Sequence, residues 1–134
     1  MSGSIRIVAH GTPAPQGSKK HVGGGRMVEV SKNLPAWRAA VEAAARLATG
    51  PAWVPWDGPV SVSGTVGIRR PGSTKFKDFP AGAPDLDKIQ RAIGDALEKS
   101  RLITNDARIV HWDIRKVWAT GTPGADLTVT ELVG

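Results

Sequence analysis

The sequence predicts an α/β fold in which a mixed sheet of about four main strands carries two packed helices. Two segments place apolar residues at helical spacing, and four others alternate apolar and polar residues as half-buried strands do. One sheet with helices packed on it accommodates both kinds of segment. A chain of 134 residues has room for one core but not for a second module, so a single domain over residues 1–134 is expected.

The first half of the chain predicts a strand, a glycine-rich loop and a helix. Ile5, Ile7 and Ala9 lie at alternate positions of a strand that stops before Pro13. Glycines 23–25 are a candidate hairpin tip before residues 27–30. Pro35 suits the first turn of a helix that ends at Gly50. Its apolar side is formed by Trp37, Val41, Ala44, Ala45 and Ala48.

The second half predicts one helix among three strands. Residues 60–68 alternate most cleanly, and residues 127–130 form the last strand after a turn at 121–124. Between them, a strand running to Trp118 is expected to turn Val110, Trp112 and Ile114 inward. Trp53 and Trp56, in the turn-rich segment 51–58, are expected to cover the core rather than stack on bases. The helical stripe consists of Leu86, Ile89, Ile93, Ala96 and Leu97.

Charge and composition favour a polyanionic partner. Eighteen Lys and Arg against twelve Asp and Glu give a net charge of +6, and nucleic acid is the partner that such a balance most often indicates. The chain has no cysteine, no apolar run of 18 residues and no signal-peptide pattern at its start. We therefore expect a soluble, cytoplasmic protein that does not act at a membrane.

Carboxylates cluster around the start of the second helix. Asp87, Arg91 and Asp95 fall on its outward face as a ladder of i,i+4 pairs, and Asp85 can join Asp87 only if it precedes the first turn. Asp106 follows the helix. Three converging carboxylates repel one another unless a cation lies between them, and oxygen ligands without Cys or His indicate Mg²⁺ or Mn²⁺. The alternative is structural: Asp85 caps the helix, Asp87 pairs with Arg91, and Asp106 closes a turn.

Basic residues gather in segments that could contact phosphates. A loop that leads directly into Asp85 can hold a phosphodiester beside a metal, although a solvated loop would have the same composition. The strand ending at Trp118 places one lysine in line with its inward residues, where it can reach an acidic site or extend outward. The candidate DNA contacts are Lys19, Lys20, Arg26, Arg69, Arg70, Lys75, Lys77 and Lys116.

The run Pro84-Asp85-Leu86-Asp87, the helix that follows and Asn105-Asp106 before a strand resemble the RusA family of Holliday junction resolvases. The likeness extends over most of the chain. It implies metal binding by Asp85, Asp87 and Asp106, a homodimer, and a phage or prophage setting. Two positions depart from the family pattern: Arg91 replaces a common lysine, and Asn105 replaces the first acid of an acidic pair. Arginine keeps the positive charge but does not readily release a proton, so its expected role is electrostatic.

The resemblance implies a metal-dependent endodeoxyribonuclease that cuts four-way DNA junctions in recombination and repair. Asp85, Asp87, Asp106 and Arg91 are then the candidate catalytic residues. Two alternatives remain open on the residues alone. One is a basic DNA-binding module without turnover, and the other is a metal nuclease acting on different branched DNA.

Overall fold

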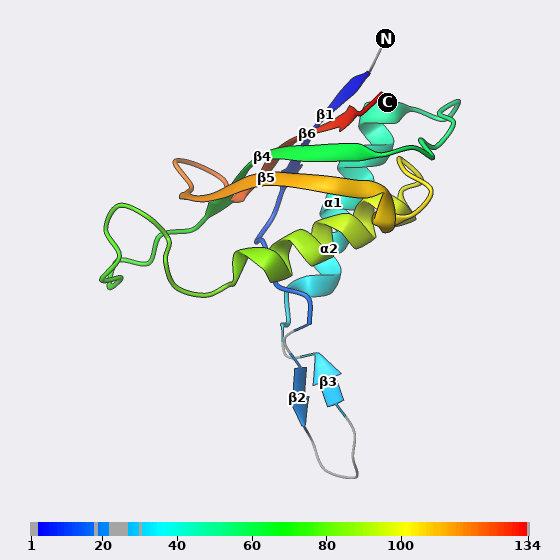
Figure 1. Ribbon diagram of the computed structural model, residues 1–134. Helices are drawn as coiled ribbons and strands as arrows, with labels where there is room; N and C mark the ends of the chain where they lie inside the picture. Colours follow the sequence, from blue (N-terminus) through cyan, green and yellow to red (C-terminus); the bar gives the residue numbers. More distant parts are fainter. Residues whose placement is uncertain (1–2, 18, 22–26, 30, 134) are drawn as a thin grey trace.

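The computed structural model describes residues 3–17, 19–21, 27–29 and 31–133, and for 19–21 and 27–29 it describes the backbone only. Strands and helices alternate along the chain (Figure 1). In chain order the elements are β1 Ser4–His10, β2 Lys19–His21, β3 Met27–Glu29, α1 Leu34–Thr49, β4 Val60–Ile68, α2 Leu86–Lys99, the 3₁₀ helix η1 Asp106–Arg108, β5 Ile109–Trp118 and β6 Gly124–Glu131.

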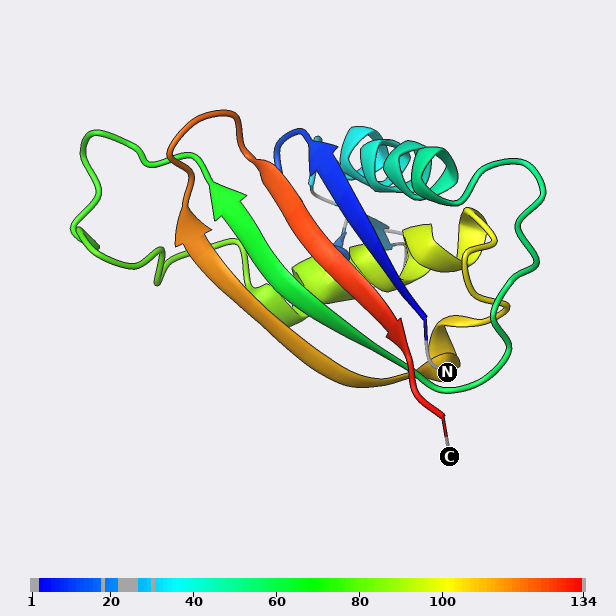
Figure 2. The ribbon, with the colours of Figure 1, turned by 90° about the horizontal axis from the view of Figure 1, so that it is seen from above.

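The main sheet has the strand order β1-β6-β4-β5. β6 pairs antiparallel with β1 and β4, whereas β4 and β5 are parallel. A parallel pair needs a crossover, and here α2 supplies it. Both helices lie on one face of the sheet, and the other face is open (Figure 2). The predicted α/β fold, a mixed four-stranded sheet with two helices packed on it, is confirmed.

The core lies between the sheet and its two helices. Its largest fully buried side chains include Trp37 and Val41 of α1, Ile93 of α2, and Val62 and Leu127 of the sheet. Leu34, Trp37, Val41 and Ala45 form the buried side of α1, which ends at Gly50 as predicted. The helical spacing of apolar residues therefore identified the faces that pack on the sheet, except that Ala48, predicted on the apolar side of α1, is exposed.

One predicted inward residue points the wrong way. Val110 is 62% exposed, whereas Ile109 packs against the core. The cause is an irregularity at the start of the β4–β5 ladder: Val60 pairs with Ile109 and Ser61 pairs with His111, so Val110 is skipped. A bulge of this kind shifts the alternation by one residue. Beyond it, Trp112 and Ile114 pack inward as expected.

Two further predictions concern connecting segments. β2 and β3 pair antiparallel as a hairpin that projects away from the sheet and helices (Figure 1), and its tip lies outside the described residues. Trp53 and Trp56 meet edge to face with ring centroids 5.0 Å apart, and Nε1 of Trp53 donates to the carbonyl of Leu102 at 3.1 Å. The tryptophans therefore cover the core, as predicted. Among the helices in the described part of the chain, none is long and apolar enough to cross a membrane.

Candidate active site along helix α2

Asp85 and Asp87 lie at the beginning of α2. Asp85 has an extended backbone at the N-cap position, and its carbonyl accepts the amide of Ile89 at 3.1 Å, which starts the helix. Its side chain forms no capping hydrogen bond and is 62% exposed. Lys88 approaches it at 3.8 Å, a loose contact. The prediction that Asp85 precedes the first turn is confirmed, and the alternative that its side chain caps the helix is not.

The backbone of Asp106 is held by hydrogen bonds, and the residue is exposed to solvent. It is the first residue of η1, and the side chain of Asn105 caps this helix by accepting the amide of Ala107 at 2.8 Å. The Asp106 amide donates to Oε1 of Glu98 on α2, also at 2.8 Å. Asn105, which departs from the family pattern, thus has a structural role that an aspartate can also fill.

Asp87 and Asp106 border the same cavity, which has a volume of about 260 Å³. Gly94 and Trp112 lie between them, and Asp106 packs beside Gly94. Gly94 follows Asp87 by two helical turns, which is about 10 Å along the axis. Asp85 does not line this cavity. Among the residues that the structure describes, no three His, Asp or Glu side chains are close enough to hold a metal within one chain.

The expected ladder of ion pairs on α2 is wrong. Within the described residues, Arg91 pairs with neither Asp87 nor Asp95. Asp95 instead meets Arg38 of α1 at 3.4 Å. The packing of α1 against α2 brings this partner closer than the helix neighbour does. Asp87 is therefore left without the structural partner that the alternative interpretation assigned to it.

Arg91 lines the same cavity as the two acids. It is exposed, and its guanidinium lies directly beside Gly17, whose segment is attached to α2 by the amide of Gln16, which donates to the Lys88 carbonyl at 3.0 Å. A positive charge between two carboxylates can offset their repulsion or face a bound phosphate.

A cluster that the sequence did not indicate anchors the segment carrying Asp106. The Asp57 carboxylate accepts hydrogen bonds from Thr104 and, at 3.1 Å, from Nη2 of Arg108. These contacts lower the pKa of Asp57, the bond from Thr104 most and that from Arg108 next. Nε of Arg108 also donates to the Asp57 carbonyl at 2.7 Å. Thr104 precedes η1 and Arg108 is its last residue, so these contacts attach η1 to the 51–58 segment.

The predicted DNA contacts fall into three groups. Arg69, Arg70, Lys75 and Lys77 are exposed on the loop that arcs away from the sheet before α2 (Figure 1), which fits a phosphate-binding surface. Lys19 and Lys20 lie in β2 with their side chains outside the described part, and Arg26 lies wholly outside it.

Lys116 is engaged elsewhere in the domain. Its ammonium donates to the backbone carbonyls of Gly82 at 2.8 Å and Pro84 at 2.9 Å. It therefore extends toward the segment before Asp85, although it bonds to carbonyls and to no carboxylate. No contact with DNA is needed to explain its position.

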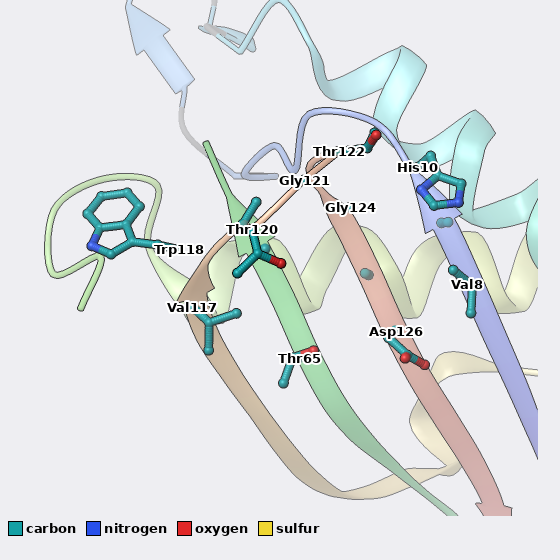
Figure 3. Close-up of a pocket in the computed structure, with 14 residues that line it drawn as sticks. Val8, His10, Thr65, Val117, Trp118, Thr120, Gly121, Thr122, Gly124 and Asp126 are labelled. Carbon is teal, nitrogen blue, oxygen red and sulfur yellow. The ribbon is translucent and has the colours of Figure 1, made fainter. Parts of the chain in front are cut away.

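A larger cavity of about 390 Å³ opens on the uncovered face of the sheet, away from the acids. Figure 3 shows His10, Thr65 and Asp126 around it, on three different strands. Arg6 donates to both carboxylate oxygens of Asp126, at 2.9 and 2.7 Å, and these bonds lower the pKa of Asp126. Asp126 is thus engaged in a surface ion pair, and the cavity lacks the free carboxylates found along α2.

The acids along α2 fit a hard divalent cation in chemistry. Carboxylate oxygens are the ligands that Mg²⁺ and Mn²⁺ take, and Asp85, Asp87 and Asp106 are all exposed to solvent. Their placement divides them into a pair at the start of α2 and a third acid beside Gly94, two helical turns after Asp87.

The model of the family described as "Endodeoxyribonuclease RusA" matches residues 10–130. A search of curated proteins found no match to the chain. The family match spans both the acid-bearing segments and the sheet that supports them, and it confirms the resemblance seen in the sequence. It carries no information on a phage or prophage origin, which stays a prediction. RusA nucleases are metal-dependent phosphodiester hydrolases that act on Holliday junctions. With acids along α2 and a match over nearly all its length, the chain belongs to the RusA family of Holliday junction resolvases.

Proposed function

We propose that the chain cuts four-way DNA junctions with Mg²⁺ bound by Asp85, Asp87 and Asp106, in an assembly of two chains. The main support comes from the exposure of the three carboxylates and from their lack of close partners. Each is exposed, and in the described part of the chain none forms a close ion pair or a cap. Carboxylates without a close protein partner keep their oxygens available to a divalent cation. Mn²⁺ takes the same donors and can replace Mg²⁺.

The residues along α2 have separate roles in this proposal. Asp85, Asp87 and Asp106 hold the ion. A bound Mg²⁺ supplies an activated water and offsets charge on the attacked phosphate and the leaving oxygen. An arginine side chain does not readily transfer a proton, so Arg91 orients and neutralises the phosphate. The scissile phosphate would lie at the part of the cavity lined by Asp87 and Arg91.

The separation of the acids supports a site shared between two chains. Mg²⁺ binds oxygen at about 2.1 Å, so its ligand oxygens lie within about 4 Å of one another. Asp106 packs beside Gly94, which follows Asp87 by about 10 Å along the axis of α2. A two-fold axis that sets two α2 helices antiparallel would bring the start of one beside Asp106 of the other. Trp112, which is partly buried and lines the same cavity as Asp87 and Asp106, offers apolar surface for such a pairing.

DNA binding is assigned to basic residues of two segments, 19–26 and 69–77, of which Arg69, Arg70, Lys75 and Lys77 are exposed in the described structure. Two chains would present paired basic surfaces to the arms of a junction, which a single flat patch cannot match in angle. Phosphate contacts of this kind would give an affinity that falls steeply with salt. The proposed contacts are Lys19, Lys20, Arg26, Arg69, Arg70, Lys75 and Lys77.

Subunit mixing tests this arrangement. Asp85→Asn, Asp87→Asn and Asp106→Asn should each abolish Mg²⁺-dependent cleavage of a synthetic four-way junction while leaving junction binding within about twofold, since no cationic phosphate contact is lost. Asp113→Asn, which removes the same charge from the exposed face of β5, should cut normally. Near-normal turnover by all three variants would remove these acids from the metal site.

Mixtures of two inactive variants then separate the shared site from a site within one chain. In a shared site, a mixed dimer of Asp87→Asn and Asp106→Asn chains has one intact centre and one doubly damaged centre, so nicking of one strand should return. Mixing Asp85→Asn with Asp87→Asn should stay inactive, because every centre then lacks one acid of the pair. If no mixture recovers nicking while the free protein sediments as a dimer, the acids converge within one chain. A free protein that sediments as a monomer, with equal affinity for junction and duplex, would contradict the dimeric arrangement.

A further inference from the structure

Lys116 places its ammonium group against backbone carbonyls of the segment that leads into Asp85. Its Nζ donates to the carbonyl of Gly82 at 2.8 Å and to that of Pro84 at 2.9 Å. We propose that Lys116 is a positioning residue that fixes the backbone before Asp85 and so sets where this carboxylate points. This inference rests on the proposed metal site, because it concerns the placement of one of its ligands.

The topology explains how a residue near the end of β5 reaches this segment. β4 and β5 are parallel, with Val66 opposite Lys116 and Ile68 opposite Trp118, so both strands end at the same edge of the sheet. The chain leaves β4 at that edge, forms the exposed basic loop and returns to begin α2 (Figure 1). Because β5 is the outermost strand, its last residues face the returning chain.

Trp118 attaches the same loop at a second point. Its Nε1 donates to the carbonyl of Phe76 at 3.1 Å. Figure 3 shows its indole turned toward the loop that follows β4. The end of β5 thus holds the loop at residue 76 and again at residues 82 and 84, and the second attachment is the one next to Asp85.

Few other contacts fix the backbone before Asp85. Proline has no amide hydrogen to donate, and the Asp85 side chain makes no capping bond. In the described part of the chain, the backbone of residues 82–84 has no hydrogen bond other than those from Lys116. Bonds from an ammonium to carbonyls are charge-assisted and stronger than neutral ones. Loss of this lysine would therefore free the segment that aims Asp85, while α2 itself would stay packed through Ile89 and Ile93.

Backbone order parameters of the metal-free protein, measured by nuclear magnetic resonance relaxation, give a readout that does not depend on cleavage. Lys116→Met removes the donors and keeps an apolar stem. We expect the order parameters of the Gly82, Ala83 and Asp85 amides to fall from about 0.85, which is typical of rigid backbone, toward about 0.6, which is typical of flexible backbone. Lys116→Arg keeps charge and donors and should restore most of this order. Arg115→Met, which removes an exposed cation from the neighbouring position of β5, is the matched control and should keep the original order parameters.

Measurements of cleavage and of junction binding then distinguish a positioning role of Lys116 from a phosphate contact. Lys116→Met should need about tenfold more Mg²⁺ for half-maximal cleavage, since groups that orient metal ligands typically change affinity or activity by about 10- to 100-fold. Its metal-free junction affinity should stay within about twofold of that of Arg115→Met. Unchanged order parameters and an unchanged Mg²⁺ requirement would overturn the proposal. A loss of junction affinity with a normal Mg²⁺ requirement would also overturn it and would make Lys116 a phosphate contact. If Lys116→Met does not fold, Lys116→Gln, which keeps uncharged donors, is measured in the same way with the same outcomes.

The two proposals can fail separately. If the unaltered chain cuts no junction with Mg²⁺ or Mn²⁺, the proposed metal site is wrong. The comparison of order parameters still decides whether Lys116 holds the segment before Asp85.

Discussion

Replacing Gly17 with alanine should displace Arg91 without disturbing the core. Gly17 has φ +96, a conformation that L side chains rarely adopt. A Cβ built there overlaps with Nη1 of Arg91 and lies 3.4 Å from its Cζ. Carbon and nitrogen atoms pack at about 3.5 Å, so the guanidinium would have to move by about 1 Å.

The expected loss of stability and the expected loss of cleavage rate differ in size. The end of an arginine side chain can rotate, so relieving the overlap costs little stability. The backbone conformation costs about 1–2 kcal/mol for alanine, which lowers the melting temperature by about 3–8 °C in a domain of this size. Cleavage should fall much further, because a 1 Å misplacement of an orienting group can reduce a rate by about a hundredfold.

Junction cleavage under single-turnover conditions and thermal unfolding should be measured together. Arg91→Ala should lose as much cleavage as Gly17→Ala, whereas Arg91→Lys should keep most of it. Gly121→Ala adds the same methyl in open space at an ordinary backbone angle and serves as the control. A Gly17→Ala protein that melts early yet cuts at the normal rate would show that the position of Arg91 does not matter to the reaction.

Two predictions concern the support of Asp106. Asn105→Ala removes the cap of η1, so it should cost about 1 kcal/mol of unfolding free energy and reduce cleavage. Asn105→Asp should retain both stability and cleavage. An Asn105→Ala protein that equals the original in melting temperature and cleavage rate would contradict this role. Asp57→Asn should destabilise the protein in a pH-dependent way. The folded-state pKa of Asp57 lies below its ordinary value of 3.8, so its ionised form stabilises the fold above that value. That contribution is lost as the pH falls through the lowered pKa. The difference in unfolding free energy between the two proteins should therefore be present at neutral pH and vanish in acid, and a constant difference at all pH values would contradict the ion pair with Arg108.

Local periodicity made most of the fold predictable. The stripe through Ile89 and Ile93 identified the buried face of α2, because side chains three or four residues apart on a helix face the same way whatever surrounds them. Alternation identified β1 and β4 for the corresponding reason in strands. The family resemblance rested on Asp85, Asp87 and Asp106 in one order along the chain, and the family match confirmed the family. The roles of these acids remain predictions.

Relations between segments had to come from the tertiary structure. No local pattern reveals that the ladder skips Val110, since the bulge depends on how β5 meets β4. The pairing of Asp95 with Arg38 depends likewise on the packing of α1 against α2. Such contacts join residues far apart in the chain, and spacing in one segment carries no information about the distance to another.

The amino-acid sequence by itself determined which side chains are available for chemistry: three acids, an arginine among them and basic loops around them. Only the tertiary structure decided their distances. It placed Asp106 beside Gly94 rather than beside Asp85, and it turned Lys116 toward the carbonyls of Gly82 and Pro84. The physical reason is that Asp106 lies outside α2. Its distance from Asp85 and Asp87 depends on how η1 packs against Gly94 and Glu98 of the helix, and spacing along the chain does not fix that packing.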